Sequence, residues 1–348
     1  MPKAFVEMEK LKVPHSGLGQ FCLHAGRALV AQRPAELELH FYVPAARRGL
    51  FGDGVRYVTH SPVHKLTSAS RGGFDVWHCI HQDSRYLPPR RSTPLVLTIH
   101  DLNFMQKYSG RRQAARLRAL QERIDRASAV TFISEFTERT VRAHLRVEGK
   151  RTRVVYNGNS LREFPGAPRP RFAPRGPFLF TIGIVSPKKN FHVLVPFLRE
   201  LRDRSLVIAG SSASTYAQSI LRLARELGVA DRVILPGNVT DEEKYWLFAN
   251  AEAFVFPSLA EGFGLPVIEA MSLGRPVFLS TRTSLPETGG RDAFYWDDFD
   301  PAAMKEVFEG GMREIRSDPG KEGRLRAWAA RFSWERAARE YLEVYAEV

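Results

Sequence analysis

The chain has 348 residues, a length that favours two domains over a single core. Its hydrophobic fraction of 44% and charged fraction of 26% are typical of a globular enzyme. No apolar run approaches the roughly 18 to 20 residues that cross a bilayer, which argues against a membrane-spanning protein. The formal net charge of +13 lies in the first half, because residues 1–170 carry +14 and residues 171–348 carry −1. This half should meet an anionic partner: nucleic acid, anionic membrane or a phosphorylated substrate.

The N-terminal stretch and the cysteines indicate a cellular compartment. The first residues read MPKAFVEMEKLKVPHSG, with scattered charges and no apolar signal core, so we expect no export and a cytoplasmic location. Cys22 and Cys79 both stand in apolar surroundings. We expect two buried thiols that stay reduced.

In chain order, the first half alternates apolar runs with helical patterns. Strands are predicted at AFVEM, ELHFYVP, VRYVTH, DVWHCIH, PLVLTIHD, AVTFIS and TRVVYNG, and helices at GQFCLHAGRALVAQ and the basic segment 110–127. Strands separated by helices favour a largely parallel sheet that is covered on both faces. The proline-rich segment 164–178 predicts a linker.

The second half repeats this alternation. Strands are predicted at FLFTIGIV, SLVIAG, RVILPG, AFVFP and PVFLST, and the end of the chain, from RLRAWAARF onward, has helical apolar spacing with no strand after it. The predicted fold class is therefore α/β, with one doubly wound domain over residues 1–165 and another over residues 166–331.

The segment EGFGLPVIEA places Glu261 and Glu269 eight residues apart around a glycine-rich turn. Pro266 is a natural first helical residue and Gly274 a natural residue just past the helix end. Glu261 is expected in the loop after a strand and Glu269 in the first turn of the helix, both facing the crevice where open α/β sheets bind ligands. A helix start favours phosphate and carboxylates favour hydroxyls, so a nucleotide sugar fits. The alternative is a glutamate that only stabilises its helix and a second one in solvent.

Two further segments place candidate ligand-binding residues after strands. TIGIVSPKKN puts Gly183, Lys188 and Lys189 at a strand-to-helix junction, where a flexible lysine can reach a diphosphate. TIHD closes a strong strand with His100 and Asp101. Solvated lysines and a structural histidine are the alternatives.

A short glycine loop precedes the first predicted helix. In HSGLGQF, Gly17 and Gly19 permit a close approach of backbone to phosphate, although the segment is too short for a dinucleotide-binding fingerprint.

Two segments imitate metal sites, and neither is expected to bind a metal. HCIH would place His78, Cys79 and His81 on one strand, where alternation points the two histidines to opposite faces. WDDFD contains Asp298 and Asp300 before a proline, which favours a turn.

These motifs together carry a family resemblance. PSLAEGFGLPVIEAMSLGRPV, SPKKN, TIHD, VVYNG and the terminal SWERAAREYLEVY are similar to segments of retaining glycosyltransferases of family 4, typified by bacterial mannosyltransferases. The resemblance covers nearly the whole chain. It implies a GT-B fold, in which two Rossmann-like doubly wound domains face an inter-domain crevice and a terminal helix, about residues 332–348, packs back on the first domain.

The resemblance also implies roles for the candidate residues. His100, Glu261 and Lys189 would be catalytic: Glu261 would hold hydroxyls of the transferred sugar, His100 would touch that sugar near the reacting carbon, and Lys189 would contact the diphosphate. Glu269 would hold the ribose of the nucleotide. The remaining donor-binding positions would be Gly17, Gly19, Gly183, Lys188 and the backbone N–H groups of Phe263, Gly264 and Leu265. The family often has Arg where this chain has Ile184, so Lys188 is expected to supply that charge.

The implied activity is transfer of a hexose with retention at the anomeric carbon. The expected donor is GDP-mannose, from which mannose would be transferred. The acceptor would be a lipid-linked, lipopolysaccharide or exopolysaccharide glycan, and no metal or other cofactor is expected. A nucleotide-sugar epimerase or a phosphorylase would suit the same fold. The basic half leaves open a nucleic-acid-binding protein, although no nucleic-acid-binding module is evident and no nucleic-acid partner is expected.

The basic half also suggests peripheral attachment to the inner face of the plasma membrane. The predicted helix 110–127 holds six arginines, with Ala115, Leu117, Leu120 and Ile124 available for an apolar stripe. A helix that covers a parallel sheet has the same pattern, and that is the alternative.

Overall fold

A computed structural model describes residues 1–14, 16–65 and 73–348, so His15 of the HSGLGQF segment lies outside the described residues. The chain divides into two compact units. The first comprises Met1–Gly158 and Phe332–Val348, and the second comprises Asn159–Arg331. The boundary predicted from the sequence follows residue 165, whereas the second unit of the structure includes the proline-rich segment and the residues just before it.

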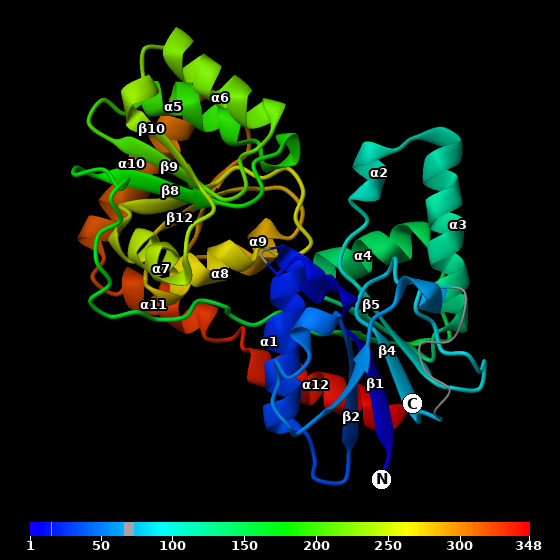
Figure 1. Ribbon diagram of the computed structural model, residues 1–348. Helices are drawn as coiled ribbons and strands as arrows, with labels where there is room; N and C mark the ends of the chain where they lie inside the picture. The colour runs from blue at the N-terminus through cyan, green and yellow to red at the C-terminus, as the bar shows by residue number, and fades with distance from the viewer. Residues whose placement is uncertain (15, 66–72) are drawn as a thin grey trace. The chain divides into compact units, whose positions relative to one another are not determined.

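The first unit is built on a seven-stranded parallel sheet with the order β3-β2-β1-β4-β5-β6-β7 (Figure 1). The order reverses between β1 and β4, which makes their carboxyl ends the switch point of this sheet. The strands are β1 (Lys3–Glu7), β2 (Glu38–Val43), β3 (Arg56–Thr59), β4 (Val76–Cys79), β5 (Leu95–Ile99), β6 (Ala129–Phe132) and β7 (Arg151–Val154).

Helices cover both faces of this sheet. They are α1 (Gly17–Gln32), α2 (Phe104–Lys107), α3 (Gly110–Arg126), α4 (Glu135–His144) and α12 (Trp334–Glu347), with short 3-10 turns η1 (Glu9–Lys12), η2 (Ala45–Arg47) and η3 (Pro62–Lys65). Successive side chains of a strand point to opposite faces. Trp77 accordingly joins the core that contains Leu120 of α3, while its neighbour His78 contacts α12.

The C-terminal helix α12 belongs to the first unit, where it packs on α1. It begins after Ser333, whose side chain accepts the N–H of Arg336. A buried polar network fixes the helix to the sheet, because His78 bonds the Tyr345 hydroxyl through Nδ1 and the Thr98 hydroxyl through Nε2, both at 2.7 Å. Burial lowers the pKa of His78 to about 3, so the ring is neutral at pH 7.

Helix α3 packs its apolar stripe against the sheet. Leu120 and Ile124 are buried in the core, and Leu117 packs beside them. Ala115 is exposed and does not extend the stripe. The structure therefore supports the alternative, a sheet-covering helix, for the apolar face, while the other face exposes arginines. None of the helices in the described residues is long and apolar enough to cross a membrane.

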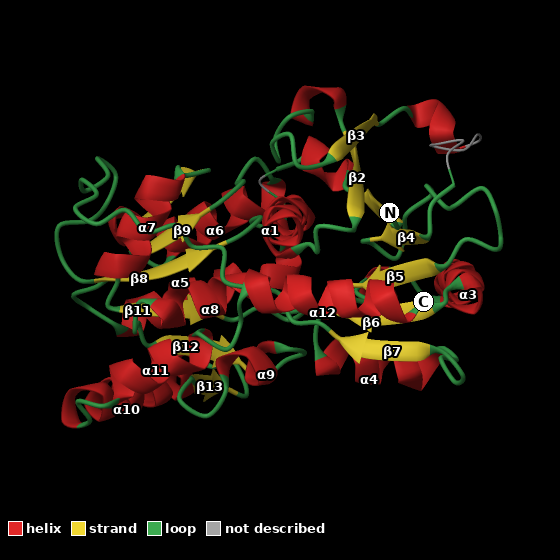
Figure 2. Ribbon diagram, turned by 90° about the horizontal axis from the view of Figure 1, so that it is seen from below, coloured by secondary structure: helices red, strands yellow, loops and turns green. Residues whose placement is uncertain are grey.

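The second unit holds a six-stranded parallel sheet with the order β10-β9-β8-β11-β12-β13, seen with its helices in Figure 2. The order reverses between β8 and β11. The strands are β8 (Phe178–Ile182), β9 (Ser205–Ala209), β10 (Val233–Gly237), β11 (Ala253–Phe256), β12 (Val277–Ser280) and β13 (Phe294–Trp296).

Helices also pack against this second sheet, and one continuous apolar core lies beneath them. They are α5 (Leu194–Glu200), α6 (Thr215–Glu226), α7 (Asp241–Asn250), α8 (Leu265–Ser272), α9 (Leu285–Gly289), α10 (Pro301–Ser317) and α11 (Lys321–Ala329), with 3-10 turns η4 (Pro187–Lys189), η5 (Phe191–Val193) and η6 (Ala230–Arg232). Both sheets are parallel and have helices packed against them, so the predicted α/β class with two Rossmann-like domains is confirmed.

Candidate active site

The SPKKN segment forms a tight turn just after β8. Gly183 follows the strand and donates its N–H to the carbonyl of Ala209 at 3.0 Å. Asn190 ends the turn in the left-handed conformation, with φ of 58°, which asparagine tolerates better than most residues. Lys188 is exposed, whereas Lys189 turns inward and retains only 12% of its side-chain exposure.

Lys189 forms an ion pair with Glu261, which lies in the loop after β11. The Nζ atom of Lys189 lies 2.5 Å from Oε1 of Glu261, and the Glu261 side chain is also 12% exposed. The Ser258 hydroxyl donates to the same oxygen at 2.6 Å. Both bonds use Oε1, so Oε2 has no partner among the described residues and can accept a hydroxyl from a ligand. The pair joins the ends of β8 and β11, the switch point of the second sheet.

The glycine loop after Glu261 leads into α8. Gly264 caps the helix with φ of 107°, a conformation that favours glycine, and a Cβ atom there would lie 3.0 Å from the Leu285 side chain, a tight contact. The helix begins at Leu265, one residue before Pro266. A helix start leaves its first N–H groups without helical partners, which favours an anion there.

Glu269 lies in the second turn of α8, because the helix begins at Leu265; its predicted place in the first turn is wrong. The residue is 5% exposed, so most of its side chain is covered by neighbouring residues. Its Oε1 atom accepts from Nζ of Lys244 in α7 at 3.0 Å. Lys244 was not predicted from the sequence, because nothing in the local pattern of α7 signals a partner 25 residues away.

The Gly17 to Gly19 loop lies in the first unit and starts α1. Ser16 caps the helix by accepting the N–H of Gly19 at 3.0 Å. A Cβ atom on Gly19 would lie 2.2 Å from the Val13 carbonyl, so glycine is required by close backbone packing. The close packing within the loop and the bond from the Gly19 N–H to Ser16 explain why glycine occupies position 19. Phosphate binding is not needed to explain it. Gly17 has open space around its Cα.

His100 follows β5 in the first unit and is held from two sides. Its Nε2 atom lies 2.7 Å from the carbonyl of Ile80; since a carbonyl can only accept, Nε2 carries the proton and Nδ1 is the acceptor. The Gln82 amide accepts the His100 N–H at 3.0 Å and donates to the carbonyl of Asp101 at 2.8 Å. Burial lowers the pKa of His100 to about 4, so the ring is neutral at pH 7.

A buried carboxyl group, Glu7, ends β1 beside the first unit's switch point. It is 1% exposed, and burial raises its pKa to about 7. One oxygen accepts the N–H of Glu9 at 3.1 Å, whereas Oε2 has no partner in the described part of the chain. Glu7 was not predicted from the sequence, where it resembles an ordinary strand-end residue.

The two segments that imitate metal sites have structural roles. Strand β4 ends at Cys79, so His81 lies beyond the strand and its predicted place on it is wrong. Asp300 caps α10 and accepts the N–H groups of Ala302 and Ala303, and Asp298 accepts the N–H of Asp300, as a turn predicts. Over residues 1–14, 16–65 and 73–348, no cluster of His, Cys, Asp and Glu could hold a metal ion.

Comparison with known families shows which family the chain belongs to. The model "Glycosyltransferase Family 4" matches residues 20–163, and the model "Glycosyl transferases group 1" matches residues 168–308. The second match contains the whole turn after β8, the loop after β11 and α8. The chain belongs to the family 4 glycosyltransferases. The resemblance expected from the sequence is confirmed, and the epimerase, phosphorylase and nucleic-acid alternatives are not favoured.

Relatives of this glycosyltransferase include bacterial mannosyltransferases. The chain is 25% identical over 99% of its length to "O-antigen chain mannosyltransferase B" of Escherichia coli, of which it covers 99%. It is 31% identical over 48% of its length to "Serotype-specific mannosyltransferase WbdA" of Escherichia coli, of which it covers only 21%.

Solved structures with the same fold span the whole chain. A sucrose-phosphate synthase from Thermosynechococcus elongatus is similar with a TM-score of 0.76 at 18% identity, over 100% of this chain and 99% of that one. HepE of Anabaena, solved in complex with UDP-glucose, is similar with a TM-score of 0.75 at 17% identity over 100% of both chains. These likenesses confirm the GT-B fold of the glycosyltransferase.

Proposed function

We propose that this glycosyltransferase moves mannose from GDP-mannose to the glycan of a lipid-linked or lipopolysaccharide-type acceptor, with retention at the anomeric carbon. The observation that carries the proposal is the Lys189–Glu261 pair at the switch point of the second unit, beside the start of α8. The choice of mannose is supported by the full-length relative, the O-antigen chain mannosyltransferase B of Escherichia coli.

Each glutamate of the motif has one oxygen on a lysine and one left for the donor. Glu261 uses Oε1 for Lys189, and Glu269 uses Oε1 for Lys244. In the proposed complex, Oε2 of Glu261 accepts a hydroxyl of the transferred sugar, and Glu269 accepts a ribose hydroxyl. The lysines offset the negative charge of the two carboxylates, which would otherwise repel the diphosphate.

The diphosphate is proposed to lie between the start of α8 and the SPKKN turn. Lys188 is exposed there, and Ile184, at the position where the family often has arginine, is 54% exposed. Lys188, Lys189 and the N–H groups of Gly264 and Leu265 would stabilise the charge that develops on the leaving diphosphate. We therefore propose that transfer needs no metal ion, so activity should survive EDTA. Loss of activity in EDTA and its recovery with Mg²⁺ would refute this.

The first unit is proposed to receive the acceptor and to meet an anionic membrane surface at the inner face of the plasma membrane. Arg111, Arg112, Arg116 and Arg118 are exposed on α3, whose apolar stripe is buried against the sheet. Attachment would therefore be electrostatic rather than by insertion of that helix. His100, neutral with Nδ1 as an acceptor, is proposed to contact a hydroxyl of the donor sugar.

Donor choice is tested by ligand-induced stabilisation. A ligand that binds only the native state raises the midpoint of thermal unfolding, by an amount that grows with its concentration over its Kd. The purified protein is heated with GDP-mannose, UDP-glucose, UDP-galactose and ADP-glucose in parallel. GDP-mannose should give the largest shift, and proton NMR of the product should show the α configuration of the donor sugar. A larger shift with a UDP-sugar, or a β product, would overturn the donor or the retention.

A further inference from the structure

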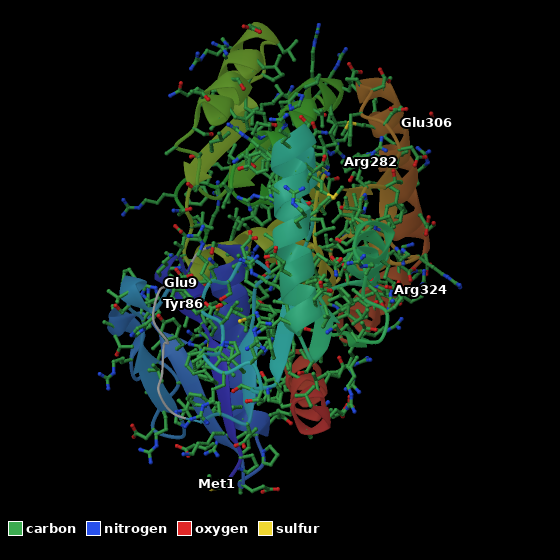
Figure 3. All side chains as sticks on the ribbon, turned by 90° about the vertical axis from the view of Figure 1, so that its right-hand side faces the viewer. Met1, Glu9, Tyr86, Arg282, Glu306 and Arg324 are labelled. Carbon is green, nitrogen blue, oxygen red and sulfur yellow. The ribbon has the colours of Figure 1, made fainter. Side chains whose placement is uncertain are left out.

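Side-chain hydroxyls after β12 hold the backbone of the Glu261 loop. The segment 280–288 begins at the end of β12, and Arg282 within it is labelled in Figure 3. Ser280 donates to the Ser258 carbonyl at 2.5 Å, and Thr288 donates to the Phe263 carbonyl at 2.5 Å. The Ser284 hydroxyl lies 2.9 Å from the Phe263 carbonyl and 3.1 Å from that of Glu261, and shares its proton between them.

Thr283 completes these contacts from an unfavourable backbone conformation. Its hydroxyl accepts the N–H of Glu261 at 3.0 Å. Its φ is 57°, in the left-handed region that a β-branched residue rarely adopts. Such a conformation is less stable than an ordinary one and persists where surrounding contacts require it. A glycine would adopt it without strain, so the threonine side chain has a use at this position.

These hydrogen bonds determine the direction in which the N–H of Gly264 and the side chain of Glu261 point. In a trans peptide unit, the C=O and the N–H of the next residue point in opposite directions. The carbonyl of Phe263 is bonded by Ser284 and Thr288, so the N–H of Gly264 points away from the segment 280–288. The N–H of Glu261 is bonded to Thr283, which fixes the backbone from which the Glu261 carboxylate extends toward Lys189.

We propose that Thr283, Ser284 and Thr288 are positioning residues for the donor: they hold the loop so that the Glu261 carboxylate and the Gly264 N–H face the nucleotide sugar together. This rests on the proposed function, because it assumes that the donor binds at this loop. None of the three need touch the donor, and each acts through the backbone of residues 261–264. Ser284 and Thr288 are fully buried, so their hydroxyls bond to protein groups: both bond to carbonyls of this loop, and the Thr288 hydroxyl also lies 3.1 Å from the Ser284 carbonyl.

The test exploits the strain at Thr283. Thr283→Ser keeps the hydroxyl, whereas Thr283→Gly removes the hydroxyl and relieves the strain. Ser284→Ala removes a second hydroxyl of the set. Ser317→Ala is the control, since the exposed Ser317 at the end of α10 donates a similar bond to a backbone carbonyl, that of Glu314. For each variant, kcat and KM for the donor and the midpoint of thermal unfolding are measured, with kinetics taken well below every midpoint.

Thr283→Gly should lower kcat by about 10-fold, because misplacement of a reacting group by a fraction of an ångström reduces transition-state contacts, while its unfolding midpoint stays level or rises. Ser284→Ala should lower kcat similarly, and Thr283→Ser and Ser317→Ala should stay within about twofold of wild type. Wild-type kcat in Thr283→Gly, or an equal loss in Thr283→Ser, would overturn the proposal. If the wild type itself transfers no sugar, the proposed function fails, and calorimetry of GDP binding then decides: equal affinity in Thr283→Gly and wild type would overturn the positioning role.

Discussion

The ammonium of Lys189 lies 2.5 Å from a carboxylate oxygen of Glu261, 72 residues further along the chain. One residue follows the first strand of the second unit and the other follows the fourth, and these strands are neighbours where the sheet order reverses. The carboxyl ends of the strands at such a reversal are where open α/β sheets bind their ligands. The fold thus brings a cation, a carboxylate and a helix start to one place.

Replacement of either motif glutamate should abolish most of the activity. Glu261→Ala and Glu269→Ala should each cut transfer by roughly 10²-fold, because each removes a contact that positions the donor. Steady-state transfer assays measure this. Glu306→Ala is the control, because Glu306 is exposed on the outer helix α10, where it is labelled in Figure 3. Near-normal turnover in both motif variants would refute their roles.

Loss of Lys244 should destabilise the second unit. Lys244→Met leaves the Glu269 carboxylate, which is 5% exposed, without its cation, and removal of one partner of a buried pair costs about 3–5 kcal/mol. Urea unfolding measures the loss. The double variant Lys244→Met with Glu269→Gln carries no unpaired charge and should recover most of the stability. An unchanged urea midpoint in the single variant would show that the pair contributes nothing.

Glu7 should make stability fall as the pH rises. Its pKa is about 7 in the folded protein against 4.5 as the ordinary value, so the folded state holds an extra proton between these values. The stability linked to that proton is full below pH 4.5 and is lost as the pH rises through 7. Between pH 5 and 8.5 the loss is about 2.5 kcal/mol.

The variant Glu7→Gln isolates this effect. The glutamine side chain does not titrate. The free energy of unfolding of the variant minus that of the wild type should therefore increase by about 2.5 kcal/mol from pH 5 to 8.5. The buried histidines titrate in both proteins, so their contributions cancel in the difference. A difference that stays constant with pH would show that Glu7 is already ionised at pH 5.

The proposed membrane contact should depend on the arginines of α3. Anionic vesicles should pellet the protein at low salt and release it as salt rises, because each basic residue near the surface contributes on the order of 1 kcal/mol and the Debye length is about 8 Å at physiological salt. Arg111→Gln with Arg112→Gln should weaken pelleting. The control pair, Arg222→Gln with Arg225→Gln, removes two exposed arginines from α6 of the second unit. Equal effects of both pairs would leave no role for α3.

The sequence predicted the elements of the fold well, because each is encoded locally. Buried parallel strands are continuous apolar runs, as in Leu95–Ile99, and glycines or prolines mark the turns between them. The strand-end positions of Glu261, Lys189 and His100 follow from those runs. His81 was misplaced because its apolar neighbours continue past the end of β4, where no strand partner extends the ladder.

Contacts between distant segments were not predictable from local pattern. Lys244 reaches Glu269 from another helix, and the hydroxyls of Thr283 and Ser284 reach the Glu261 loop from the next strand's end. The burial of Glu269 follows from these tertiary contacts, as does the use of the Gly19 N–H by its own helix cap. The local pattern of a single sequence does not show which distant residues meet in the fold, so it predicts none of these contacts.

This site should transfer a sugar from a nucleotide donor, and transfer of a labelled sugar measures that directly. Wild type and Glu261→Ala are incubated with GDP-mannose labelled in the mannose and with a lipid-linked glycan acceptor, and both labelled acceptor and released GDP are quantified. We expect labelled acceptor and GDP in equal amounts from wild type, with about 1% of that rate or less from Glu261→Ala. Label that stays on the nucleotide, or equal rates from the two proteins, would contradict it.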